Sequence, residues 1–287
     1  MHGRANRHAP LAQQLTRLSA NEMVSALGAG ALPPLLRRGL ALPLSALSRR
    51  LGATLAELDL SIDEVGLAAA AARALQSFGV TARASGEAVG AGPCLVLANH
   101  PGAYDALALM SAIGREDLAI LAADRGFLRS LPRLSRQLLF VGDGAAPRAA
   151  TLKRALTWLG RGGALLHFPA GQIEPDADFS PSGAALLATW QPGVAALVRA
   201  TRRARGQVFV AGVRGVHSPR AKRLRLNRWA ERRGVTTLSP LLQMVVRLAD
   251  VTTRVHRIEL GDQLAVAPVF EHEARLRGAL LSAIQRA

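Results

Sequence analysis

Short apolar runs alternate with helix-like stretches of about 10 to 15 residues through the middle of the chain. The runs are almost continuously apolar, as expected for strands that are covered on both faces. Alternation of this kind indicates crossover connections and a parallel sheet. The sequence therefore predicts an α/β fold, in which a mostly parallel central sheet flanked by helices occupies a domain over 76–287. The expected strands lie at 93–99, 118–124, 139–144, 163–171, 207–216 and 251–260, and the stretch 81–92 is expected to form a short strand and a Gly-rich turn.

Residues 1–75 are expected to form an N-terminal helical segment. The first 20 residues are polar and are expected to be loosely ordered, and Met23 to Leu51 are expected to form short helices broken by prolines. This stretch is either a helical layer packed on the core or an amphipathic hairpin that docks on a membrane surface. A further helix is expected to begin at Ser61, as N-cap, and to end at Gly79.

The chain is strongly basic, with a formal net charge of +16, which points to anionic partners but says little about the fold. An anionic membrane, an acidic carrier protein and nucleic acid all fit this charge. The single cysteine, Cys94, excludes a disulfide framework and is expected to be a small buried thiol. No apolar stretch reaches the roughly 20 residues that a spanning helix needs, and the scattered histidines predict no metal site.

The stretch NHPGAYD, at positions 99–105, combines a histidine and a carboxylate just after a predicted strand. Open α/β sheets bind ligands at this edge. Asp105 is expected in the first turn of the next helix, from which it can reach one ring nitrogen of His100. A carboxylate so placed fixes the imidazole tautomer, and the pair can act as a general base. Gly102 would allow close approach of a ligand. The simpler interpretation of the motif is that Asp105 only caps the helix.

A second motif, FPAG at Phe168, Pro169, Ala170 and Gly171, follows another predicted strand. Together the two motifs resemble those of the lysophospholipid and glycerol-phosphate acyltransferase family. Its first motif is Asn-His, four residues, then Asp, which Asn99, His100 and Asp105 match; its third motif is Phe-Pro-Glu-Gly, from which Ala170 departs. More closely, NHPGAYDA, FPAGQI and WQPGVAALVRATRR are similar to a bacterial branch labelled hemolysin-like acyltransferases. The resemblance covers roughly residues 75–220.

The resemblance implies transfer of a fatty acyl group from a thioester, either acyl-CoA or acyl-carrier protein, to a hydroxyl of a lysolipid or glycerol-phosphate acceptor. His100 would be the general base and Asp105 its orienting partner, while Asn99, Gly102 and the turn at 168–171 would bind substrate. No cofactor is implied. In the family the glutamate that Ala170 replaces helps to position the head group, so an amino-acid lipid or another lysolipid becomes a more plausible acceptor. The alternative is a lipid-binding protein that kept the fold and lost turnover.

A second family motif usually supplies a cation for phosphate, and Arg125 and Arg148 are the candidates here, with Arg129 less favoured. His167 lies inside an apolar strand and is expected to be a core histidine. Glu174 could replace the missing carboxylate, but the simpler expectation is that the turn GQIEPD keeps its charges in solvent.

The tract from Arg202 to Arg233 holds eleven Lys or Arg residues and a single acid, Glu231. It suits an anionic bilayer or an acidic carrier protein, and we expect no specific nucleic-acid binding. These features predict a peripheral protein on the cytoplasmic face of a bacterial inner membrane.

Overall fold

The computed structural model describes residues 2–26, 33–102, 104–180, 183–223, 243, 250–261 and 269–287. The chain divides into two compact units. The first contains Met1–Thr81, Arg125–Arg136 and His217–Val251, and the second contains Ala82–Asp124, Gln137–Val216 and Thr252–Ala287. Whether residues 1–75 act as a separate docking segment stays a prediction.

A mostly parallel sheet, seven strands wide in the described part of the chain, confirms the predicted α/β fold. The strand order is β1-β7-β6-β2-β5-β3-β4. β2 pairs in parallel with β5 and β6, β3 pairs in parallel with β5 and β4, and β7 runs antiparallel to β6. The strands are β1 (Thr81–Gly86), β2 (Cys94–Ala98), β3 (Leu118–Ala123), β4 (Leu138–Val141), β5 (Ala164–His167), β6 (Gln207–Arg214) and β7 (Thr252–Glu259).

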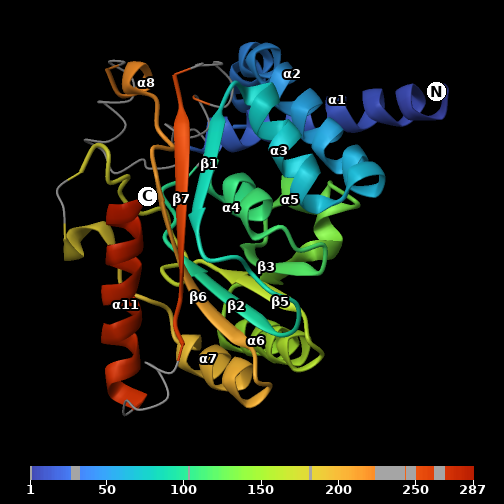
Figure 1. Cartoon of the computed structure of the whole chain (residues 1–287). Helices are drawn as coiled ribbons and strands as arrows, with labels where there is room; N and C mark the ends of the chain where they lie inside the picture. Colours follow the sequence, from blue (N-terminus) through green and yellow to red (C-terminus); the bar gives the residue numbers. More distant parts are fainter. Residues whose placement is uncertain are drawn as a thin grey trace. The chain divides into compact units, whose positions relative to one another are not determined.

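Three helices, α6 (Ala145–Gly160), α7 (Val194–Arg203) and α11 (Val269–Arg286), cover one face of the sheet. Their buried side chains form one apolar cluster with the inward residues of β2, β5 and β6. Figure 1 shows α11 running alongside β7. α4 (Asp105–Ile113) contacts β6 and β7, and Cys94 is buried as expected. Because β2, β5 and β6 are parallel, the loops that follow them meet at one edge of the sheet.

In the first unit, α1 (His2–Ala26) packs on α2 (Pro34–Val65), so the expected loose N-terminus and broken short helices are wrong. Polar residues such as Gln13 and Arg17 occupy the exposed face of α1, while the opposite face is buried. The helices approach closely at Gly52, where a Cβ atom would lie 2.4 Å from the Thr16 hydroxyl oxygen. Packing of the two apolar faces outweighs the local cost of helix-breaking residues, which is about 1 kcal/mol for Gly and 3 for Pro.

The helix predicted from Ser61 to Gly79 is confirmed in part. α3 (Leu67–Phe78) ends at Gly79 as expected, but Ser61 lies inside α2, and the break between α2 and α3 falls at Gly66. On either side of Pro132 the chain forms α5 (Gly126–Arg129) and a 3-10 turn over Leu134–Gln137. A short helix, α8 (Pro219–Arg223), ends the described part of the basic tract, and positions 224–233 lie outside the described residues. No helix in the described part of the chain is long and apolar enough to cross a membrane.

Candidate active site

His100 and Asp105 form the contact that their spacing predicted. β2 ends at Ala98, and Asp105 is the first residue of α4, so the intervening turn brings the carboxylate back to the imidazole. The His100 Nδ1 atom lies 2.7 Å from Asp105 Oδ2. The Asp105 side chain is 1% exposed and that of His100 is 30% exposed. Nδ1 is therefore committed to a buried partner, which leaves Nε2 as the ring nitrogen for an incoming proton.

The turn between the two residues holds the carboxylate in place. Asp105 Oδ2 also accepts a hydrogen bond from the backbone N–H of Gly102 at 2.6 Å, and Oδ1 accepts one from Ala106 at 2.6 Å. Gly102 has φ of +102°, a conformation that a residue with a Cβ atom rarely adopts. The glycine of the motif is thus needed for the turn itself, and its predicted contact with a ligand stays a prediction.

The second motif lies beside the first. The Phe168 ring packs on the His100 ring, with centroids 4.5 Å apart and planes inclined by 33°. Pro169 and Ala170 are buried, and the Pro169 carbonyl accepts a hydrogen bond from the Gln191 N–H. Gly171 closes the turn with a bond from its N–H to the Phe168 carbonyl, 3.0 Å long. The structure therefore brings FPAG to His100, while the role of the turn in substrate binding stays a prediction.

Asn99 bonds to the next strand of the sheet. Its side chain is buried, its Nδ2 donates to the Val213 carbonyl at 2.8 Å, and its Oδ1 accepts from the Val213 N–H at 2.7 Å. This amide continues the pairing of β2 with β6 by one further step beyond the last residue of β2. The amide thus fixes the start of the His100 turn, and its predicted role in substrate binding stays a prediction.

Two opposing effects act on the pKa of His100. Burial disfavours the charged ring, but the charge and hydrogen bond of Asp105, and then the charge of Glu174, outweigh burial and raise the pKa above its ordinary value. The net effect stabilises the imidazolium that forms when the ring accepts a proton. For His167, by contrast, burial is the cause of the shift and lowers its pKa to about 4. His167 is half-buried at the end of β5, so its predicted core role is only partly met.

Glu174 is buried, so the simpler expectation that its turn stays in solvent is wrong for this residue. Its Oε2 accepts the backbone N–H of His100 at 2.9 Å, and its Oε1 accepts that of Ala188 at 2.8 Å. Asp176, two residues on, is also buried and accepts the N–H groups of Gly215 and Val216. The sequence signal for these buried carboxylates is a pair of acids two residues apart after the FPAG turn, but the sequence alone does not identify their partners.

No hydrogen bond or ion pair joins the predicted cations Arg125 and Arg148 to His100 in the described part of the chain. Arg148 is exposed at the start of α6, and Arg125 is exposed in the first unit, next to α5. Their predicted roles in binding phosphate stay predictions. No group of three or more potential ligand side chains in the described residues is placed to hold a metal ion.

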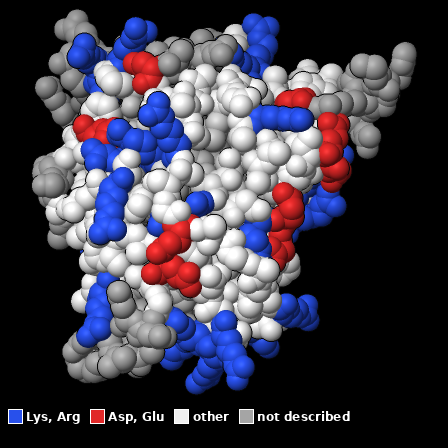
Figure 2. Space-filling model, in the orientation of Figure 1, with Lys and Arg blue, Asp and Glu red and all other residues white. Residues whose placement is uncertain are grey.

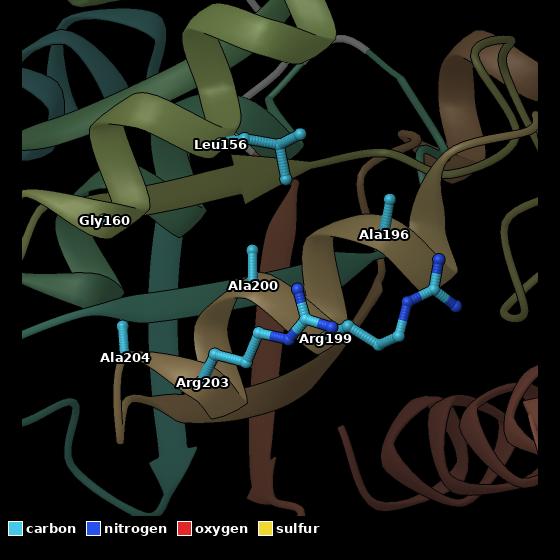
Figure 3. Close-up of a pocket in the computed structure, with 7 residues that line it drawn as sticks. All are labelled: Leu156, Gly160, Ala196, Arg199, Ala200, Arg203 and Ala204. Atoms are coloured by element: carbon cyan, nitrogen blue, oxygen red, sulfur yellow. The ribbon is translucent and has the colours of Figure 1, made fainter.

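A shallow groove of about 490 Å³ lies apart from the His100 turn, between α6 and α7 (Figure 3). Arg199 and Arg203 project from α7 along it, and Figure 2 shows basic side chains gathered at the lower edge of the view, where α6 and α7 lie in Figure 1. The ends of both helices on this side lead into the first residues of β5 and β6, opposite the edge that carries His100. The lining residues are Leu156, Gly160, Ala196, Arg199, Ala200, Arg203 and Ala204.

No protein-family model matches the chain, and no curated protein matches it. Among solved structures, the crystal structure of the 1-acyl-sn-glycerophosphate (LPA) acyltransferase, PlsC, from Thermotoga maritima is similar to it with a TM-score of 0.47. The identity is 12%, and the match covers 99% of this chain and 97% of that chain. A likeness at this level does not by itself indicate a shared activity.

Proposed function

We propose that the protein is an acyltransferase that moves a fatty acyl group from a thioester to a hydroxyl group of a lipid acceptor. The observation that carries this proposal is the His100–Asp105 pair, 2.7 Å apart, with one ring nitrogen held by a buried carboxylate and the ring partly open to solvent. This is the arrangement of a general base. The proximity of FPAG to the pair supports the same activity, because both motifs resemble those of one acyltransferase family.

In the proposed reaction, His100 Nε2 removes the proton of the acceptor hydroxyl as its oxygen attacks the thioester carbonyl. The new C–O bond forms, the C–S bond breaks, and the imidazolium returns the proton to the departing thiolate. Asp105 stabilises the imidazolium between these steps. The donor is acyl-CoA or acyl-carrier protein, and the acceptor is a glycerol-phosphate, a lysolipid or an amino-acid lipid; Arg125 and Arg148 remain the proposed phosphate contacts.

The decisive experiment measures thiol release from acyl-CoA or acyl-carrier protein with a panel of these acceptors. We expect His100→Ala to lower turnover by at least about 10³-fold, the scale of general base catalysis. His256→Ala is the matched control, because His256 lies on β7 and contacts Ser85 rather than the His100 turn. Absence of thiol release by the unaltered protein with every acceptor, together with retained lipid binding, would instead favour the lipid-binding alternative.

We also propose that the protein docks peripherally on an anionic membrane through the first part of α2, at the cytoplasmic face of a bacterial inner membrane. Leu35, Leu36 and Leu42 are 79%, 60% and 72% exposed. Leu35 and Leu42 are seven residues apart and therefore share one helix face, as membrane-surface helices require.

Co-sedimentation with phosphatidylglycerol vesicles tests this docking. Leu35→Ser combined with Leu42→Ser should reduce the bound fraction severalfold, because each loses an apolar side chain that would enter the bilayer boundary. Phe179→Ser is the control, since Phe179 is an exposed apolar residue of the second unit. Equal binding of all three proteins would contradict docking through α2.

A further inference from the structure

A single residue, Glu174, bonds to both the backbone N–H and the backbone carbonyl of His100. The His100 N–H donates to the Glu174 carboxylate at 2.9 Å, and the His100 carbonyl accepts the Glu174 backbone N–H at 2.7 Å. The Glu174 side chain is buried, and its second oxygen accepts the N–H of Ala188 at 2.8 Å. Both carboxylate oxygens therefore accept backbone N–H groups, and the side chain is bound to the protein with only 3% of its surface exposed.

A second residue holds the far end of this connection. Arg277, on α11, donates to the Ala188 carbonyl at 2.9 Å and to the Leu187 carbonyl at 3.2 Å. Its guanidinium carbon lies 5.6 Å from the centre of the Trp190 ring, a distance typical of a cation–π contact. A continuous series of contacts thus runs from α11 through the 187–190 segment and Glu174 to His100, and hydrogen bonds to charged groups are among the stronger ones.

We propose that Glu174 is a positioning residue for His100, and that Arg277 supports it from α11. This inference rests on the proposed function. By fixing both the N–H and the carbonyl of His100, Glu174 sets the direction in which the ring leaves the backbone. The ring then stays between Asp105 and Phe168, with Nε2 in one place. An imidazole displaced by about 1 Å loses roughly 10²-fold in rate, which is the scale of the effect expected here.

The buried charge of Glu174 has a second consequence. In the described residues, the charged groups that act on the His100 ring are Asp105 from α4 and Glu174 from the loop after β5. Both favour the imidazolium. Burial raises the pKa of Glu174, while the hydrogen bonds from His100 and Ala188, followed by the positive charges of His100 and Arg277, act in the opposite direction. Loss of the Glu174 charge should therefore lower the pKa of His100.

Asp176 provides a matched control for a purely structural role. Both acids are 3% exposed and lie in the same loop, and each accepts backbone N–H groups on both carboxylate oxygens. Asp176 accepts the N–H groups of Asp178, in its own loop, and of Gly215 and Val216, which follow β6. A variant at Asp176 thus reports what the loss of one buried carboxylate does to the loop alone.

The test compares Glu174→Gln with Asp176→Asn in the full chain. We expect Glu174→Gln to lower kcat by about 10- to 100-fold with little change in KM, because an amide keeps one acceptor oxygen and turns its NH₂ group toward the other N–H. The acid limb of its kcat/KM profile should move to lower pH. Asp176→Asn should lower the melting temperature about as much as Glu174→Gln does, and it should leave the acid limb in place. An unmoved limb in Glu174→Gln, with no greater loss of kcat than in Asp176→Asn, would overturn the proposal.

An NMR titration of the histidine ring carbons separates this inference from the proposed function, since it needs no turnover. The His100 signal is assigned from its absence in His100→Ala. We expect its pKa to fall in Glu174→Gln and to stay unchanged in Asp176→Asn, even if no acceptor is found. An unchanged pKa in both variants would overturn the proposal while leaving the acyltransferase question to the activity assay.

Arg277 gives a second variant that leaves Glu174 in place, which keeps the proposal testable if Glu174→Gln fails to fold. Arg277→Met should lower kcat severalfold without changing KM, and Arg277→Lys should recover part of the loss because a lysine can still donate to a carbonyl. Full kcat in Arg277→Met would show that α11 has no part in positioning His100.

Discussion

The sheet edge that carries His100 and the groove between α6 and α7 differ in how their charged groups are held. At the edge, Asp105 and Glu174 are buried and accept backbone N–H groups. In the groove, Arg199 and Arg203 are exposed, and neither forms an ion pair among the described residues. A buried acceptor that loses its donor costs about 1–3 kcal/mol, whereas an exposed cation remains hydrated. Geometry is therefore fixed at the edge and loosely constrained in the groove.

The charge of the two regions differs as well. The sequence of α6 and α7 contains cations but no Asp or Glu, so this helical face is basic throughout. The His100 edge instead combines an imidazole with two buried carboxylates. Chemistry that moves a proton needs the second arrangement, because the charge formed on the imidazole must be stabilised where it forms.

The largest expected effect is that of Asp105→Asn, which removes the charge beside His100 and keeps the side-chain shape. We expect turnover to fall by about 10³- to 10⁴-fold, as for the equivalent change in other histidine–carboxylate pairs. Because the Asp105 charge raises the pKa of His100, its loss lowers that pKa. Activity requires the neutral ring, so the acid limb of kcat/KM should move to lower pH. Nearly unchanged turnover with an unmoved limb would show that Asp105 serves only as a helix cap.

The next effect is on stability rather than rate. Asn99→Ala leaves the N–H and the carbonyl of Val213 without partners in a buried site, which should lower the free energy of unfolding by about 3 kcal/mol. Urea denaturation measures this, with Thr157→Ala, an exposed position on α6, as control. A loss below about 0.5 kcal/mol would mean that water replaces the amide and that Asn99 is not needed to fix the turn.

The sequence predicts structural features that depend on neighbouring residues, but it does not predict contacts between residues that are distant in the chain. The strands follow from apolar runs, and the contact of His100 with Asp105 follows from a five-residue spacing across one turn. The partners of Asn99 and Glu174 lie 114 and 74 residues away, so the register of the sheet decides them. The prediction for residues 1–20 is wrong for a similar reason. This polar stretch is helical because the opposite face of α1 packs on α2.

Paired glycine substitutions compare the packing of the two regions. In Gly212→Ala, on β6, the added Cβ would lie 2.2 Å from backbone atoms of Ala283 and Ile284 in α11. Displacement of that backbone should cost about 1–3 kcal/mol. In Gly160→Ala, at the end of α6, the Cβ meets nothing within 4 Å, and stability should stay constant or rise by up to about 1 kcal/mol. Thermal denaturation of both variants measures the contrast, and similar losses in the two would contradict it.

The smallest expected effect is that of the double variant Arg199→Gln/Arg203→Gln. Neither arginine has an ion pair in the described part of the chain, so stability should change by no more than about 0.5 kcal/mol. Turnover with acyl-CoA should also stay constant at low salt, where any electrostatic contribution is strongest. Two results together would contradict the comparison. They are a clear loss of turnover in the double variant and a similar loss when salt is added to the unaltered protein. The groove would then contribute to binding of the anionic donor, and precise geometry at His100 would be only one of two requirements for activity.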